Sequence, residues 1–185
     1  MDDFDDVLRR AQAGDGRAAA RLFRAYQPLL LRYLRSQEPR VADDLAGEVW
    51  LAAAAQLRDF RGDERGYRAW LFTVARRRVL EHRRRGIRRR TDIVDPVTFA
   101  DTGAADRDPA DLAADALDAG AAIDLIARVL SPEHAEVVIL RTVADFTAGE
   151  VAELLGRTEN WVRVTQHRAL QRLSAHVGEK VLVTI

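Results

Sequence analysis

The stretch RAWLFTVARRRVLEHRRRGIRRR, residues 68–90, decides how the rest of the chain is organised. Arginine fills nine of the fifteen positions from 76 to 90, against a single acid. The segment opens apolar, and at about 100° per residue four side chains share one arc of a helix: Tyr67, Trp70, Leu71 and Val74. We expect a helix that is packed at its start and strongly cationic along one flank and at its end. Gly86 is expected to stop it, because glycine accepts the left-handed conformation that closes helices.

A run of nearly pure arginine repels itself and favours a polyanion as a partner, so it predicts contact with a nucleic acid. The alternatives are a solvated helix end and a targeting signal. Solvated charged faces normally mix both signs, whereas this segment carries almost one sign only. The arginine segment is therefore a candidate nucleic-acid surface.

The composition indicates a cytoplasmic protein with one domain or two small ones. The 185 residues are 48% apolar, which is enough for a packed interior. The absence of cysteine excludes disulfides, thiolate metal sites and thiol catalysis, and is typical of a reducing compartment. The acidic start, MDDFDD, is unlike a signal peptide, and no run approaches the roughly 18 apolar residues of a membrane span. No membrane insertion is therefore expected.

The formal net charge of zero conceals an asymmetry along the chain. Residues 1–90 hold 21 Arg and 13 acids, a balance of +8, whereas residues 91–127 hold one Arg and nine Asp, a balance of −8. We hypothesise that the acidic segment lies across the arginine face and discourages DNA binding by the free protein, although salt screens such an attraction over about 10 Å. The alternative is a passive tether.

The hydrophobic pattern predicts helices throughout, because no alternating strand pattern is present. The first half should hold helices over three ranges before the arginine-rich one: 5–13, 16–36 and about 41–57. A loop is expected from Phe60 to Gly66. The composition from Thr91 to Asp118 predicts a linker that is extended at first, with a helix from near Asp111 to Leu130.

The last third carries clear helix start signals. Ser131 as N-cap and Pro132 at the first helical position predict a helix over 132–143. Thr147 and Glu150 form a capping box that begins the next helix.

Two crossing helices are predicted within residues 147–173. A small residue, a glycine at the turn and an apolar anchor have the spacing of a helix-turn-helix unit, at Ala152, Gly156 and Val162. Thr158 can cap the second helix. That helix is expected to turn outward side chains that bond base edges or phosphates: Asn160, Trp161, Arg163, Thr165, Gln166 and Arg168.

These segments resemble a known family in order and in spacing. Three of them are similar to region 2 of the extracytoplasmic-function (ECF) sigma factors, a group of the bacterial sigma-70 family: FRAYQPLLLRYL (23–34), ADDLAGEVWLAAAAQLRDF (42–60) and YRAWLFTVARRRVLEHRRR (67–85). The segment LSPEHAEVVILRTVADFTAGEVAELLGRTENWVRVTQHRALQRL (130–173) is similar to region 4. An acidic, variable linker between the two regions is also common in that family.

The resemblance implies an all-α fold of two small helical domains joined by an acidic flexible linker. The region 2 bundle would span residues 1–90, the linker 91–118 and the region 4 helix-turn-helix 119–178. Members of the family bind core RNA polymerase and direct it to promoters. Region 2 holds the beta-prime clamp coiled coil and reads the melted −10 element, whereas region 4 reads the −35 duplex and docks on the beta flap. An anti-sigma factor typically restrains them.

The resemblance also assigns candidate binding residues. The core polymerase patch matches Asp43, Asp44, Glu48 and Trp50. The −10 DNA set matches Phe60, Arg61, Arg65, Trp70, Arg76, Arg77, Arg83 and Arg84. The −35 DNA set matches Thr158, Asn160, Trp161, Arg163, Thr165, Gln166 and Arg168.

The sequence departs from the family pattern in both regions. Gly47 stands where glutamine is usual, and Arg77 stands where many members have asparagine, which favours backbone contact over base reading. Trp161, Val164 and Thr165 replace the commoner Thr, Ser and Arg. The −35 sequence that is read should therefore differ from the family's average.

Two other functions are weighed against promoter recognition. A stand-alone helix-turn-helix regulator would explain residues 131–173 but would leave the 20–90 bundle without a role. An arginine-rich RNA-binding protein would explain the cationic helix. Enzymatic activity is not expected, because the four histidines lack HExxH spacing and no glycine loop could cradle a phosphate. No cofactor, metal or small-molecule substrate is predicted.

Overall fold

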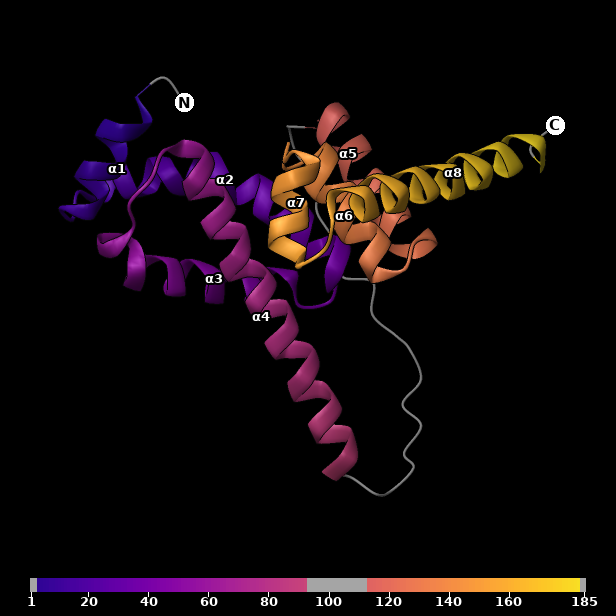
Figure 1. Ribbon diagram of the computed structural model, residues 1–185, viewed down its shortest axis with the longest axis horizontal. Helices are drawn as coiled ribbons and strands as arrows, with labels where there is room; N and C mark the ends of the chain where they lie inside the picture. Colours follow the sequence, from indigo (N-terminus) through magenta and orange to yellow (C-terminus); the bar gives the residue numbers. More distant parts are fainter. Residues whose placement is uncertain (1–2, 93–112, 184–185) are drawn as a thin grey trace.

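The computed structural model describes residues 3–92 and 113–183, and within these ranges every regular element is helical. The elements follow in the order α1 (Phe4–Gln12), α2 (Gly16–Gln37), α3 (Ala42–Gln56), the 3₁₀ turn η1 (Leu57–Asp59), α4 (Glu64–Asp92), α5 (Ala113–Val129), α6 (Pro132–Thr142), α7 (Ala148–Leu155) and α8 (Glu159–Val183) (Figure 1). The predicted all-α fold is confirmed.

Helices α1 to α4 surround a cluster of buried aromatic rings. Tyr67 of α4 lies against Tyr26 of α2, with ring centroids 5.2 Å apart, and against Phe4 of α1 at 5.5 Å. Tyr33 of α2 is completely buried and meets Phe72 edge-on at 5.4 Å. Because aromatic side chains bury large apolar areas, these contacts hold the first turns of α4 inside the bundle. The prediction that the arginine-rich helix begins packed is confirmed.

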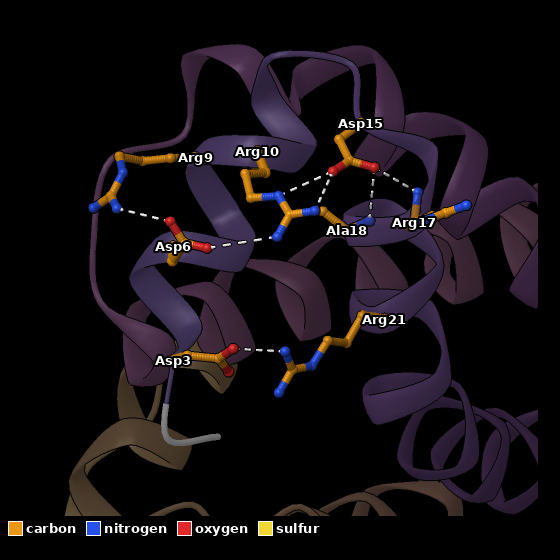
Figure 2. Close-up of polar contacts among 8 residues, drawn as sticks. All are labelled: Asp3, Asp6, Arg9, Arg10, Asp15, Arg17, Ala18 and Arg21. Carbon is orange, nitrogen blue, oxygen red and sulfur yellow. Dashed lines mark hydrogen bonds and ion pairs between the residues drawn. The ribbon is translucent and has the colours of Figure 1, made fainter.

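Two exposed ion pairs, Arg21 with Asp3 and Arg10 with Asp15, link α1 to α2 (Figure 2). The guanidinium of Arg10 binds Asp15, with Nη2 2.6 Å from Oδ2, and this hydrogen bond lowers the pKa of the Asp15 carboxyl. Asp15 also caps α2, since its Oδ1 accepts from the backbone N–H groups of Arg17 and Ala18. Such exposed pairs contribute little stability each, and their role here is to define the turn between the helices.

In helices α7 and α8, the cap, stop and anchor residues that the sequence predicts have the expected geometry. The hydroxyl of Thr147 accepts from the Glu150 N–H at 3.3 Å, and the Glu150 carboxylate accepts from the Thr147 N–H at 2.7 Å, which is a complete capping box. Gly156 closes α7 in the left-handed region, with φ 64°. Val162 of α8 is completely buried against the core. The predicted helix-turn-helix geometry is confirmed.

The two halves share a continuous hydrophobic core. Helices α5 and α6 pack against α2, and α7 lies beside α4. In Figure 1, the C-terminal parts of α4 and α8 extend away from this packed body in different directions. The charged end of α4 is therefore presented on a projecting helix.

Two expected boundaries are wrong. Gly86 does not stop α4, which continues to Asp92, because a helical glycine costs only about 1 kcal/mol and good helix formers follow it. The loop after Phe60 ends at Asp63, whose Oδ1 accepts from the Gly66 N–H at 2.8 Å and so starts α4 earlier. Helix α5 begins at Ala113, close to the predicted start near Asp111. The rest of the predicted acidic linker, 93–112, lies outside the described residues.

Candidate functional site

The outer face of α3 combines acids with one large exposed apolar side chain. Asp43 and Asp44 are exposed, Glu48 is partly exposed, and Leu51 is 75% exposed on the same face, since positions 43, 44, 47, 48 and 51 follow the helical repeat. Asp43 has a long contact with Arg35, at 3.7 Å. We call Asp43, Asp44, Glu48 and Leu51 the acidic α3 face. Leu51 was not among the predicted binding residues, although its spacing of eight from Asp43 places it on the same side of the helix.

Trp50 lies at the border of this face and is partly buried. Its indole N–H donates to Oε1 of Gln27 at 2.5 Å, and its ring lies 5.0 Å from that of Phe23 on α2. Phe23 is itself exposed. The pair makes an apolar margin next to the acids, and the indole nitrogen is already satisfied within the chain.

The loop before α4 is stabilised by rings and by one amide. Phe60 lies 5.3 Å from Trp70 and 5.6 Å from Tyr67, so Trp70 is partly buried in this cluster. Gln12 of α1 donates to the carbonyl oxygens of Leu57 and Phe60, at 3.0 and 2.9 Å. Arg61 is exposed and donates to carbonyls of its own loop. These contacts therefore fix the loop conformation in the free chain, with Phe60 partly buried and Arg61 exposed.

The arginines of α4 fall into two groups by their partners. Two of them bind acids of the second half of the chain: Arg65 binds Glu150, and Arg76 binds Glu136. Arg77, Arg83 and Arg84 lie further along α4. Arg77 is exposed and binds Glu81, and this hydrogen bond lowers the Glu81 pKa. Arg83 binds Glu38 at 2.5 Å, and Arg84 is exposed.

Helix α8 turns one face inward and the opposite face to solvent. Val162 and Ala169 are completely buried, and Thr165 between them is 5% exposed. The expectation that Thr165 points outward is wrong, because it lies on the same helical face as these two anchors. Asn160 and Arg163 are exposed, as expected.

The remaining −35 candidates occupy the ends and flanks of that face. Thr158 caps α8 by accepting from the Trp161 N–H at 3.2 Å. Trp161 is partly buried, with the Arg157 guanidinium 5.0 Å from its ring centroid. Gln166 is partly buried and accepts from Arg141 at 3.1 Å, whereas Arg168 is exposed. Three further side chains, outside the predicted −35 set, are exposed on the face opposite Val162: Val164, His167 and Gln171.

Comparison with known proteins identifies both halves. Residues 22–90 match the Sigma-70 region 2 model, and residues 127–175 match the Sigma-70 region 4 model. The ECF RNA polymerase sigma factor SigD of Mycobacterium tuberculosis is 33% identical over 94% of this chain and 84% of its own length. The chain belongs to the ECF sigma factors. It is therefore a promoter-specificity subunit of bacterial RNA polymerase, which binds promoter DNA and directs transcription initiation.

Other members of the family show the same relationship. The ECF RNA polymerase sigma factor BldN of Streptomyces coelicolor is 30% identical over 91% of this chain and 64% of its own length. Among solved structures, the sigma factor RpoE of Bartonella quintana, in complex with the anti-sigma factor NepR, matches with a TM-score of 0.67. It is 23% identical and covers 86% of this chain and 96% of its own. CnrH, in complex with the cytosolic domain of CnrY, has a TM-score of 0.62 at 20% identity, covering 95% and 97%. These structural matches support the fold.

Among the described side chains, no group of three or more acids and histidines is arranged to hold a metal ion. Within the same part of the chain, no helix is both long and apolar enough to cross a membrane.

Proposed function

We propose that this ECF sigma factor uses three binding surfaces. The acidic α3 face binds core polymerase, the Phe60 loop with α4 binds −10 DNA, and α8 binds −35 DNA. Residues 1–90 would then act as region 2 and residues 119–178 as region 4. The observation that carries the proposal is the acidic α3 face, because it leaves acids and Leu51 exposed in a region matched as sigma region 2. The proposed site of action is the cytoplasm.

The acidic α3 face suits a basic helical partner such as the beta-prime clamp coiled coil. Asp43, Asp44 and Glu48 supply long-range attraction, and Leu51 supplies an apolar anchor that a partner can bury. Phe23 and Trp50 extend the apolar area at its border. The indole N–H of Trp50 is bonded to Gln27, so we assign Trp50 a packing contact with the polymerase.

The Phe60 loop suits a single strand of DNA, and α4 suits its phosphates. Arg61 is exposed and follows Phe60, whose ring packs against that of Trp70. Aromatic side chains beside exposed cations are a common platform for unstacked bases. The guanidinium groups of α4, including Arg77, Arg83 and Arg84, would contribute phosphate contacts rather than base choice.

The exposed face of α8 suits the major groove of the −35 duplex. Asn160 and Arg163 offer hydrogen-bond donors, and Val164 offers an apolar contact for a thymine methyl group. His167 and Gln171 continue the same face, and Arg168 flanks it. Thr158 contributes as the cap of the helix, and we assign Thr165 a packing role.

We also propose that an anti-sigma factor controls this protein and that the protein has no catalytic activity of its own. Both similar solved sigma factors were captured in complexes, RpoE with the anti-sigma factor NepR and CnrH with the cytosolic domain of CnrY. These complexes support the proposal without identifying the partner. Region 4 would supply a second contact with polymerase, by docking on the beta flap.

Reconstituted transcription tests the function. The purified chain is added to core RNA polymerase with a panel of genomic promoter fragments, and run-off transcripts are mapped. We expect transcripts that begin at specific sites only when the chain is present. Absence of any specific transcript across the panel would contradict the proposal. Tight, sequence-specific duplex binding by the free chain, without core polymerase, would instead favour a stand-alone regulator.

A further inference from the structure

Arg157 lies in the turn between α7 and α8 and was not among the predicted −35 residues. Its backbone is fixed, because its N–H donates to the Ala152 carbonyl at 2.9 Å where Gly156 closes α7. The next residue, Thr158, caps α8. The side chain of Arg157 is 51% exposed. The turn therefore presents a cation at the start of the helix that we propose for −35 DNA.

Two contacts orient the guanidinium of Arg157. It lies over the ring of Trp161, 5.0 Å from the ring centroid. Its Nη2 donates to Oε1 of Glu133, on α6, at 3.0 Å. Trp161 is partly buried and packs against the hydrophobic core, so its ring is a fixed surface. Stacking on one face and pairing at one edge therefore restrict the orientation of a group that still reaches solvent.

The ion pair with Glu133 leaves this guanidinium able to bind a second anion. An arginine carries five N–H donors in a planar fork, and the contact with Glu133 is made by Nη2. The donors at the opposite edge of the fork can bind two oxygens of a phosphate. The N-terminus of α8 adds the positive end of a helix dipole nearby. A phosphate is therefore a suitable ligand for Arg157.

The pair lies beside the face of α8 that we propose enters the major groove. That face carries Asn160 and Arg163. Trp161 is about 100° around the helix from Asn160, and Arg168, seven positions after Trp161, lies on the same flank as that ring. A recognition helix turns its outer face to base edges, whereas its flanks face the two backbones that bound the groove. A cation on this flank therefore meets phosphates rather than bases.

We propose that Trp161 acts on DNA through Arg157: its ring holds the guanidinium beside the groove wall, where Arg157 binds a phosphate of the −35 duplex. The inference rests on the proposed role of α8 in −35 binding. Trp161 is a positioning residue and reads no base itself. Arg157 contributes affinity and register rather than base choice.

The ring contributes by ordering Arg157 before DNA arrives. A free arginine side chain loses rotamer freedom when it binds, and this loss weakens the complex. Stacking on Trp161 restricts the side chain in advance, so less freedom is lost on binding. Leucine at position 161 could fill apolar volume, but it has no aromatic face for the cation. The effect of the ring on Arg157 can therefore be separated from its packing.

Binding of the holoenzyme to a labelled duplex promoter fragment, mapped by run-off transcription, tests the phosphate contact. The Kd is measured over a series of salt concentrations. Arg157→Gln should weaken binding and lower the logarithmic salt slope by about 0.9, which corresponds to one phosphate. The control is Arg9→Gln, which removes an exposed arginine of α1 that pairs with Asp6. It should leave the salt slope unchanged.

Variants of Trp161 then test positioning. Trp161→Leu should weaken promoter binding about two- to fivefold, the contribution of an exposed cation–π contact, whereas Trp161→Phe keeps a ring and should stay close to the parent protein. In the Arg157→Gln background, Trp161→Leu should have no further effect, because the ring has no cation left to position. Circular dichroism melts check folding. Trp161→Met replaces Trp161→Leu in both backgrounds if the leucine variant is unfolded at the assay temperature.

Each contrary result overturns a separate part of the inference. An unchanged salt slope in Arg157→Gln would overturn the phosphate contact. An equal loss from Trp161→Leu in the parent and Arg157→Gln backgrounds would overturn positioning, and would show that Trp161 contributes to binding independently of Arg157. Neither result affects run-off transcription by the parent protein, so the promoter function is judged independently. Unchanged promoter affinity in Arg163→Ala would instead contradict the proposed role of α8.

Discussion

The carboxylate of Glu150 lies between a helix cap and a neighbouring helix: it accepts from the Thr147 N–H at 2.7 Å and binds Nη2 of Arg65 at 2.9 Å. One side chain therefore completes the start of α7 and ties that start to α4. The hydrogen bond from Arg65, with those from Thr147, lowers the Glu150 pKa to about 2.

This relationship predicts acid sensitivity. A carboxyl group whose pKa is lower in the folded chain stabilises it above the unfolded pKa of 4.5, and the contribution is lost as pH falls toward about 2. Because Arg65 is mostly exposed, we expect only about 1 kcal/mol at neutral pH. Urea unfolding of the parent protein and of Glu150→Gln should differ above pH 5 and converge near pH 2. A constant difference across this window would contradict the assignment.

Two glycines are predicted to respond to alanine in opposite directions. Gly156 has φ 64° at the end of α7, so Gly156→Ala should destabilise the fold by about 1 kcal/mol through backbone strain. Gly86 lies inside α4 with nothing within 4 Å of an added Cβ, so Gly86→Ala should increase helicity. Thermal melts followed by circular dichroism measure both. Loss of helix content in Gly86→Ala would show that α4 ends there.

Leu51 is predicted to be an anchor for core polymerase. Removing an exposed apolar anchor changes the folding stability of the free protein little. It weakens the binding free energy of the complex by about 1–2 kcal/mol, or roughly tenfold in Kd. Fluorescence anisotropy titrations of labelled Leu51→Ala with core enzyme should show this loss. Ile87→Ala, which shortens another exposed apolar side chain, is the control. Equal affinity of both variants for core enzyme would show that Leu51 does not contact the polymerase.

Arg163 and Thr165 should behave differently although both were predicted to contact −35 DNA. Arg163 is exposed, so Arg163→Ala in the holoenzyme should weaken binding to promoter duplex by about 1–3 kcal/mol. If its contact is a phosphate, the logarithmic salt slope should also fall by about 0.9. Thr165 is buried, so Thr165→Val should leave promoter affinity within about twofold. A large loss of promoter affinity in Thr165→Val, with unchanged stability, would show that Thr165 does contact DNA.

Much of the local structure could be read from neighbouring residues. The Thr147–Glu150 capping box, the Gly156 stop and the Val162 anchor depend on groups within a few positions of one another, and all three are as predicted. The family resemblance was likewise confirmed by the region 2 and region 4 matches. Local signals were weaker for Gly86, since a glycine ends a helix only where the chain turns away.

Tertiary packing decided the orientation of two side chains that the hydrophobic pattern could not predict. Thr165 is polar and was expected outside, but the phase of α8 places it between Val162 and Ala169. Leu51 is apolar, but the phase of α3 places it in solvent beside the acids. In both cases the side of the helix that meets the core outweighs the character of one side chain.

The sequence by itself determined the helices, their caps, the family and the arginine-rich surface, because each depends on composition or on spacing along the chain. Only the tertiary structure decided the partners of those arginines. Glu136 lies 60 residues from Arg76 in sequence, and Glu150 lies 85 from Arg65. No local pattern indicates such pairs, since they form only when α6 and α7 pack against α2 and α4 and bring opposite charges together.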